Sequence, residues 1–147
     1  MIRYISDDVK IPNFPKRKIS AWITQIAKNN EKRIGEVSFI FCSKNTMKKL
    51  NIKYLNHSYN TDVITFDYES NTKLSGDIFI SIDDVRSNAI HFKVSFNHEL
   101  FRVMIHGILH LCGFNDTTEQ ERNTMENIEN DALSLLDKDY VIEVIKQ

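Results

Sequence analysis

Two periods in the spacing of apolar residues divide this chain into strands and helices. The segment Glu36–Phe41 has a period of two and is rich in β-branched and aromatic residues, which predicts a strand. Comparable segments predict strands at Ile2–Ile5, Asp62–Phe66 and Asp77–Ser81. Because the polar stretch Glu69–Ser75 can turn the chain back, we expect the last two strands to be hairpin neighbours.

Apolar residues that recur three and four positions apart predict five helices. The first four span Phe14–Ala27, Ser43–Tyr54, Ile82–Phe92 and Phe96–Leu111, and the last opens with the capping-box pair Thr118 and Glu121 and continues to Leu136. The residues expected to face inward include Ile19, Trp22, Ile23 and Ile26 in the first helix, Met47, Leu50 and Tyr54 in the second, Val85 and Ile90 in the third, and Met125, Ile128, Ala132, Leu135 and Leu136 in the last.

This order of elements predicts an α+β fold, with a small mixed sheet of about four strands packed with about five helices. The chain of 147 residues is 41% hydrophobic and 27% charged, which is typical of one globular domain, here residues 1–147. The first fifteen residues contain no apolar run that could be a signal peptide or a membrane span, so we expect a cytoplasmic protein. Cys42 and Cys112 lie in apolar surroundings, and we expect both to be free thiols.

Charge is distributed unevenly along the chain although the net charge is only −1. Residues 1–53 contain 12 Lys and Arg against 4 Asp and Glu, whereas residues 54–147 contain 7 against 16. The predicted first helix begins with Lys16–Lys18, which opposes the helix dipole and suggests an external partner. A basic half of this kind suits a polyanionic substrate, and a solvated basic face is the alternative explanation.

The segment His106–Asp116, with the sequence HGILHLCGFND, carries the clearest chemistry. His106 and His110 are four residues apart, so on a helix their imidazoles share one face. Gly113 suits the end of that helix, after which the chain can reverse and bring Asp116 to the same point. Two His and one carboxylate predict one zinc ion per chain at the end of a central helix, with a fourth position open for water. Iron or manganese is also compatible with this ligand set, and a pair of core histidines is the structural alternative.

The same spacing would fit the H-E-x-x-H-x-x-G-x-x-H motif of metalloproteases, with Asp116 in the last ligand position. The general-base Glu of that motif is replaced here by Gly107. A peptidase would need its base from elsewhere, so a metalloprotease is the least favoured alternative.

The segment also resembles the H-G-x-L-H-L-x-G-x-x-H signature of the YbeY family of rRNA-maturation endoribonucleases. The resemblance covers residues from about 36 to 136. Its further blocks are Leu50-Asn51, Thr61–Phe66, Gly76–Ser81, and Met125-Glu126 with Glu129.

This resemblance implies a zinc-dependent, single-strand-specific endoribonuclease that trims the 3′ end of 16S rRNA and takes part in ribosome quality control. The partners it implies are rRNA, the small ribosomal subunit and ribosome assembly factors, with no membrane and no organic cofactor. Zinc is expected to polarise a phosphate oxygen and activate its bound water, while the basic half holds the RNA. Direct hydrolysis and attack by the 2′-hydroxyl of the RNA both remain open.

Two positions depart from the family pattern. The third metal ligand is usually His and here is Asp116, whose charge should make a bound water less acidic. The family commonly has an Arg where this chain has Leu55, so a guanidinium suited to clamp a phosphate is missing. Lys53, His57 and Arg102 are the candidates to replace it, each with an ordinary surface role as the alternative.

The missing Arg strengthens a rival from another class, a non-catalytic ribosome assembly factor in which the metal only staples the last two helices. The two remaining histidines, His91 and His98, are expected to be surface residues.

Overall fold

Four strands form one mixed sheet in the computed structural model of the protein, which describes residues 1–55, 61–69 and 72–136. They are β1 (Ile2–Ser6), β2 (Ile34–Cys42), β3 (Val63–Asp67) and β4 (Leu74–Ser81), and their order in the sheet is β1-β2-β4-β3. β1, β2 and β4 are parallel, whereas β3 runs antiparallel to β4 at the edge. The predicted pairing of the last two strands is therefore confirmed.

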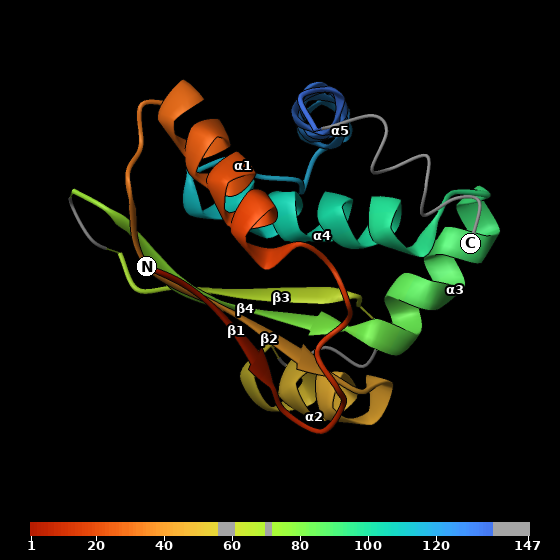
Figure 1. The fold of residues 1–147 in the computed structure, drawn as a ribbon. Coiled ribbons are helices and arrows are strands. Elements are labelled where there is room, and N and C mark those ends of the chain that lie inside the picture. Colours follow the sequence, from red (N-terminus) through yellow and green to blue (C-terminus); the bar gives the residue numbers. More distant parts are fainter. Residues whose placement is uncertain (56–60, 70–71, 137–147) are drawn as a thin grey trace.

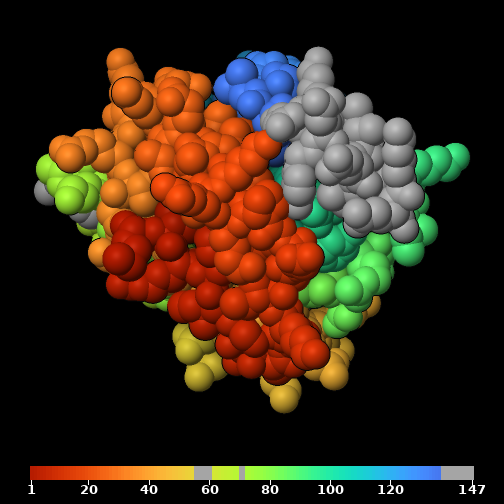
Figure 2. Space-filling view, in the orientation of Figure 1, coloured from red at the N-terminus to blue at the C-terminus, as the bar shows by residue number. Residues whose placement is uncertain are grey.

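Five helices pack around this sheet among the described residues. They are α1 (Lys16–Asn29), α2 (Lys44–Leu55), α3 (Ile82–Phe92), α4 (Phe96–Leu111) and α5 (Glu119–Ser134). α1, α4 and α5 lie on one side of the sheet and α2 on the other (Figure 1). Seen from the same direction as in Figure 1, the N-terminal residues and α1 cover much of the near face (Figure 2). The predicted α+β fold is confirmed.

The larger hydrophobic core lies between the sheet and the helices α1 and α4. The expected inward face of α1 is confirmed, because Ile19, Trp22, Ile23 and Ile26 are all buried. The indole Nε1 of Trp22 donates a hydrogen bond of 2.8 Å to the carbonyl of Ala132, which fastens α1 to the C-terminal turn of α5. α5 begins with the predicted capping box, in which Thr118 and Glu121 exchange hydrogen bonds.

A smaller core on the other face joins α2 to the sheet. It consists of Cys42, Met47 and Ile64, with Leu50, Phe66 and Phe79 packed against them. Burial raises the pKa of Cys42 to about 12, which keeps this thiol neutral. Since side chains alternate along a strand, the placement of Ile64 and Phe66 toward α2 turns Val63 and Thr65 toward α4.

Four sequence expectations about burial are wrong. Tyr54 is 54% exposed, because it lies in the last turn of α2, beyond the packed residues Met47 and Leu50. Ile90 is 75% exposed, because the packed face of α3 is set by Val85 and Ala89, and Ile90 lies about 100° further round the helix. Leu135 is 61% exposed, because α5 ends at Ser134 and its periodicity no longer orients the next residue. His98 is half-buried and does not lie on the open surface.

Gly107 marks the closest approach of α4 to β4. A Cβ atom at this position would lie 2.8 Å from Cγ2 and 2.9 Å from Cδ1 of Ile78. We expect Gly107→Ala to lower the free energy of unfolding by about 1–3 kcal/mol, because overpacking outweighs the gain in helix propensity. Urea unfolding followed by circular dichroism measures the change, and a variant as stable as the wild type would refute the tight contact.

Candidate metal centre

α4 is a largely buried helix that carries one polar stripe. Eleven of its sixteen residues are buried, and most of these are apolar. The stripe consists of Glu99, Arg102, His106 and His110, which follow one another at intervals of three, four and four residues. These intervals keep the four side chains on one side of the helix. α4 contacts the edge strand β3 and the helix α5, and residues of both accompany the stripe.

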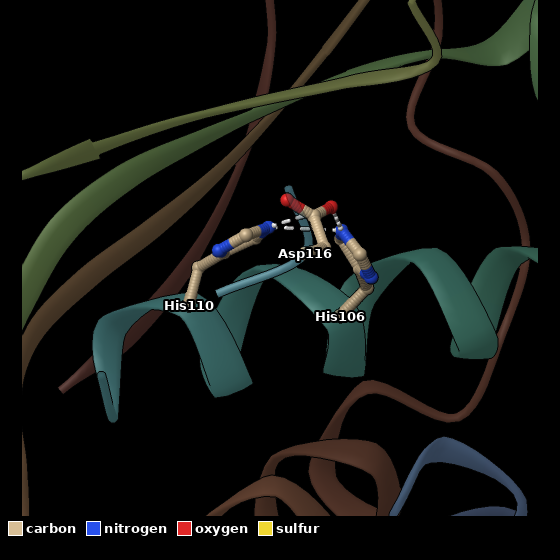
Figure 3. A group of neighbouring side chains, drawn as sticks. All are labelled: His106, His110 and Asp116. Atoms are coloured by element: carbon tan, nitrogen blue, oxygen red, sulfur yellow. Dashed lines mark hydrogen bonds and ion pairs between the residues drawn. The ribbon is translucent and has the colours of Figure 1, made fainter. Parts of the chain in front are cut away.

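His106, His110 and Asp116 bring three ligand atoms to one point, as predicted from the sequence (Figure 3). The Nε2 atoms of the two histidines are 3.0 Å apart, and Oδ2 of Asp116 lies 3.2 Å from His106 Nε2 and 3.3 Å from His110 Nε2. Gly113 follows the helix with a positive φ of 105° and lets the chain reverse. The loop after it then carries Asp116 back over the helix end.

These three residues fit a transition-metal ion. A tetrahedral zinc site with bonds of about 2.0–2.1 Å places its ligand atoms roughly 3.3 Å apart, close to the separations found here. All three side chains are half-buried, which leaves an approach for a further ligand. The geometry therefore suits a metal held by three protein groups beside an open cleft, the arrangement expected of a catalytic site.

The cleft beside the three ligands runs along the free edge of the sheet. Its cavity of about 550 Å³ is lined by His106, His110 and Asp116 and, opposite them, by residues of and next to β3, namely Thr61, Asp62, Val63, Ile64, Thr65 and Asp67. Among the described residues that line it there is no Lys or Arg. The protein part of this cleft is therefore acidic.

Glu129 of α5 orients the first of the metal ligands. Its Oε2 lies 2.6 Å from Nδ1 of His106, and its Oε1 accepts a hydrogen bond of 3.0 Å from Arg102. A proton on Nδ1 that is donated to this carboxylate leaves Nε2 of His106 unprotonated and aimed at the metal position. Burial lowers the pKa of His106, but the hydrogen bond and charge of Glu129, with Asp116 and Asp62, outweigh it and raise the pKa overall.

Arg102 lies at the centre of a cluster of buried carboxylates. Its guanidinium forms two hydrogen bonds to Glu99, one of them 2.8 Å long, and another to Glu129. Oδ2 of Asp62 is 3.9 Å from the same group and accepts a hydrogen bond from Asn88. Burial raises the pKa of Asp62 even though Arg102 opposes this effect. The cluster ties α4 to α5 and to the start of β3.

Comparison with known proteins places this site in a family. The family model described as Endoribonuclease YbeY matches residues 2–137. An Endoribonuclease YbeY of Phocaeicola vulgatus is 49% identical over 136 residues, which are 92% of this chain and 99% of that protein. The chain belongs to the endoribonuclease YbeY family.

Other relatives agree with this assignment. The Endoribonuclease YbeY of Parabacteroides distasonis is 48% identical over 92% of this chain and 95% of its own length. The solution structure of TM1509 from Thermotoga maritima is similar in fold, with a TM-score of 0.65, 23% sequence identity, and coverage of 100% of this chain and 96% of that one. The YbeY resemblance predicted from the sequence is therefore confirmed.

The candidates to replace the missing family Arg fall in three different places. Leu55, at the position of that Arg, is the last residue of α2. Lys53 is exposed on α2, on the other face of the sheet from α4, and does not line the cleft. His57 lies outside the described residues. Arg102 lies one helical turn before His106, but its guanidinium is bonded to carboxylates, so its role toward a phosphate stays a prediction.

Sequence reasoning missed the roles of Glu99 and Glu129. Glu99 is bonded to Arg102, and Glu129 is bonded to both Arg102 and His106. The two side chains are 1% and 3% exposed, respectively. A signal was present, because Glu129 falls between Met125 and Ala132 on the apolar face of α5. A carboxylate on an apolar helix face needs a buried partner, and here the partners are Arg102 and His106.

Glu129→Gln tests the support of His106, because the amide keeps the size of the side chain and removes its charge. We expect zinc affinity at neutral pH to fall by about 10- to 100-fold. The pKa of His106 should fall with it, so protons compete with zinc at higher pH in the wild type than in the variant. The ratio of the zinc affinity of the wild type to that of the variant should therefore decrease as pH decreases. Competition with a chromophoric chelator across pH measures both effects.

Glu126→Gln is the matched control, since Glu126 is exposed one turn earlier on α5. It should leave zinc affinity unchanged. Equal affinities of the Glu129→Gln variant and the wild type at every pH would exclude this role of Glu129.

Proposed function

We propose that this chain is a zinc-dependent, single-strand-specific endoribonuclease that matures the 3′ end of 16S rRNA and serves in ribosome quality control. The observation that carries the proposal is the convergence of His106, His110 and Asp116 beside an open cleft. The family match confirms the predicted enzyme class, an endoribonuclease that acts on RNA phosphodiester bonds. Zinc and the rRNA substrate are the finer parts of the proposal.

In this proposal His106, His110 and Asp116 would hold the zinc ion through the atoms that converge in the structure. When bound, zinc supplies Lewis-acid polarisation of a phosphate oxygen and lowers the pKa of a water molecule. Glu129 keeps the Nδ1 proton of His106 in place, so that Nε2 stays a ligand. Half-burial of the three side chains limits the water that reaches them, which strengthens electrostatic interactions in the cleft.

The acidic cleft explains why the metal matters for binding as well as for chemistry. Asp62, Asp67 and Asp116 line it and would repel a phosphate group in the absence of a cation. Exposed basic residues lie elsewhere, on α1 (Lys16, Arg17, Lys18 and Lys28) and on α2 (Lys44, Lys48, Lys49 and Lys53). We assign to these surfaces the salt-dependent contacts with the RNA backbone outside the cleft.

The proposed partners are rRNA, the small ribosomal subunit and ribosome assembly factors, and the proposed location is the cytoplasm. The names of the relatives, which are endoribonucleases, support RNA as the class of substrate. None of the helices within the described ranges is long and apolar enough to cross a membrane.

The proposal is tested by the cleavage of a single-stranded fragment that contains the 3′ end of 16S rRNA, with a fully base-paired duplex of the same sequence as the control. Protein loaded with one zinc per chain should cut the single strand and leave the duplex intact. Removal of zinc with a chelator should stop cleavage and also weaken RNA binding. Products with a 2′,3′-cyclic phosphate would identify attack by the 2′-hydroxyl, whereas products with a 3′-hydroxyl and a 5′-phosphate would identify hydrolysis by water.

A non-catalytic assembly factor with a structural metal is the second candidate. The observation in its favour is Leu55 at the position of the family Arg, together with the pairing of Arg102 to carboxylates. Asp116→Ala separates the two functions, because a catalytic site loses turnover while the fold survives, whereas a structural metal site loses stability as well. A metalloprotease is disfavoured, since the position of its general-base Glu is Gly107, which packs against Ile78.

A further inference from the structure

A second cavity adjoins the metal site on the side of α5. It has a volume of about 520 Å³ and shares His106 and Asp116 with the cleft along β3. Its other residues come from the end of α3, the start of α4, and α5, and include Phe92, Val94, His98, Arg122, Met125 and Asn130. A group bound in this cavity would therefore lie next to a group bound in the cleft beside His106 and Asp116.

The charge of this cavity argues against a phosphate as its occupant. Four carboxylates line it, those of Glu99, Asp116, Glu126 and Glu129, against two guanidinium groups. Arg102 is bonded to two of these carboxylates, and Arg122 donates a hydrogen bond of 2.8 Å to the carbonyl of Thr117. A phosphate would meet excess negative charge, whereas a neutral group would not.

The apolar part of the cavity suits a flat, neutral ring. Phe92 ends α3 with 56% of its surface exposed, and although its ring contacts that of His91, it also lines the cavity. Val94 and Met125 add apolar surface beside it. Aromatic side chains with apolar neighbours are the surfaces on which unpaired bases of single-stranded RNA stack.

His98 adds a polar side chain to the lining of this cavity. Its Nδ1, which is buried in the present orientation of the side chain, has no hydrogen-bond partner among the described residues. Burial lowers the pKa of His98, with Arg102 acting in the same direction and Glu99 against it, so the imidazole is neutral at pH 7. A neutral imidazole has one donor and one acceptor nitrogen, which matches the mixed edge of a nucleobase.

We infer that this cavity binds the nucleobase of a nucleotide next to the cleaved bond, with Phe92 as the stacking surface and His98 as a partner for the base edge. The inference rests on the proposed function, because it takes single-stranded RNA as the substrate of the adjoining metal site. It adds a base-binding subsite beside the three residues that would hold the metal ion. A base held there fixes the scissile phosphate over the cleft, and a base-paired nucleotide could not enter, which accounts for the preference for single strands.

Phe92→Ala is the test, and Ile90→Ala is its matched control. Ile90 is 75% exposed on the same helix and does not line the cavity. The substrates are a single-stranded hexaribonucleotide and the same hexamer with an abasic residue on one or the other side of the cleaved bond. kcat/KM of zinc-loaded protein should fall by about 5- to 150-fold for Phe92→Ala on the intact hexamer. It should change little on the hexamer that lacks the bound base, and Ile90→Ala should match the wild type on all substrates.

Equal kcat/KM values for Phe92→Ala and Ile90→Ala on the intact hexamer would overturn the subsite and leave the endoribonuclease proposal standing. If the zinc-loaded wild type cleaves neither the hexamer nor the rRNA fragment, the proposed function fails. Affinity for the same hexamers, measured by fluorescence anisotropy, then tests the subsite. Phe92→Ala should bind the intact hexamer more weakly than Ile90→Ala, and equal affinities of the two variants would overturn the subsite. A wild type that neither cleaves nor binds the hexamer would overturn both.

Discussion

Replacing His110 with Ala is expected to empty the metal site and abolish RNA cleavage. The zinc content should fall from near one per chain to near zero, because His106 and Asp116 alone cannot fix a tetrahedral ion. Cleavage should fall by roughly a thousandfold or more, since the polarising charge at the phosphate is lost. The fold should survive, because the His110 side chain is 27% exposed and its described partners are the other two ligands. Elemental analysis of the purified protein and a timed cleavage assay measure the two losses.

His91→Ala is the control for this experiment. His91 is exposed on α3 and lies outside the group of convergent ligands, so zinc content and cleavage should both match the wild type. Retention of one zinc per chain by the His110→Ala variant would contradict the metal site described here. One zinc per chain in a wild type that cuts no RNA would instead favour the assembly factor.

The three convergent residues could be located from the sequence because their geometry is local. A spacing of four residues on a helix fixes the relation of His106 to His110 without knowledge of the rest of the fold. The reversal at Gly113 brings Asp116 back within three residues of the turn, so no distant contact has to be known. The sheet was predictable for a related reason, since alternating apolar runs mark strands wherever one face is buried.

The support of this site depends on contacts between distant segments, which a single sequence does not reveal. Glu129 is 23 residues from His106, and its contact with the imidazole depends on how α5 crosses α4. Asp62 meets Arg102 only because β3 forms the sheet edge beside α4. The spacing of apolar residues also gives the buried face of a helix only approximately. For this reason Ile90 was expected to be buried and is exposed.

The structure shows where the uneven charge of the chain lies on the molecule, which the sequence alone does not show. Eight of the 12 Lys and Arg residues at positions 1–53 lie on α1 and α2, which are on opposite faces of the sheet, while the cleft at its edge is lined by carboxylates. Basic surfaces and an acidic cleft thus occupy different parts of the molecule. RNA held by the basic surfaces would need a cation in the cleft before its phosphate could approach the metal ligands.

Arg102→Ala is expected to have the largest effect on stability. Glu99 and Glu129 are almost fully buried, and Arg102 is the cation bonded to both. Its removal leaves Glu99 without its counter-charge and Glu129 with only the His106 imidazole among its described partners, which should lower the free energy of unfolding by about 3–5 kcal/mol. For a domain of this size the melting temperature should fall by roughly 6–20 °C. Thermal and urea unfolding followed by circular dichroism measure the loss.

Two further variants show whether this loss comes from the buried charges. Arg86→Ala removes an exposed guanidinium above the ring of Phe96 and should cost less than about 1 kcal/mol. Adding Glu99→Gln to Arg102→Ala removes one of the stranded charges and should restore part of the lost stability. The absence of any recovery would contradict this explanation.

Cleavage by the same variants, measured at a temperature where each is folded, decides whether Arg102 replaces the family Arg at Leu55. We expect Arg102→Ala to keep most of its turnover per folded molecule, because the guanidinium is already bonded to Glu99 and Glu129. A folded variant without turnover would show that Arg102 acts on the phosphate. Unchanged cleavage in both Arg102→Ala and Lys53→Ala would exclude both residues from that role, and phosphate binding in the cleft would then depend on the metal ion.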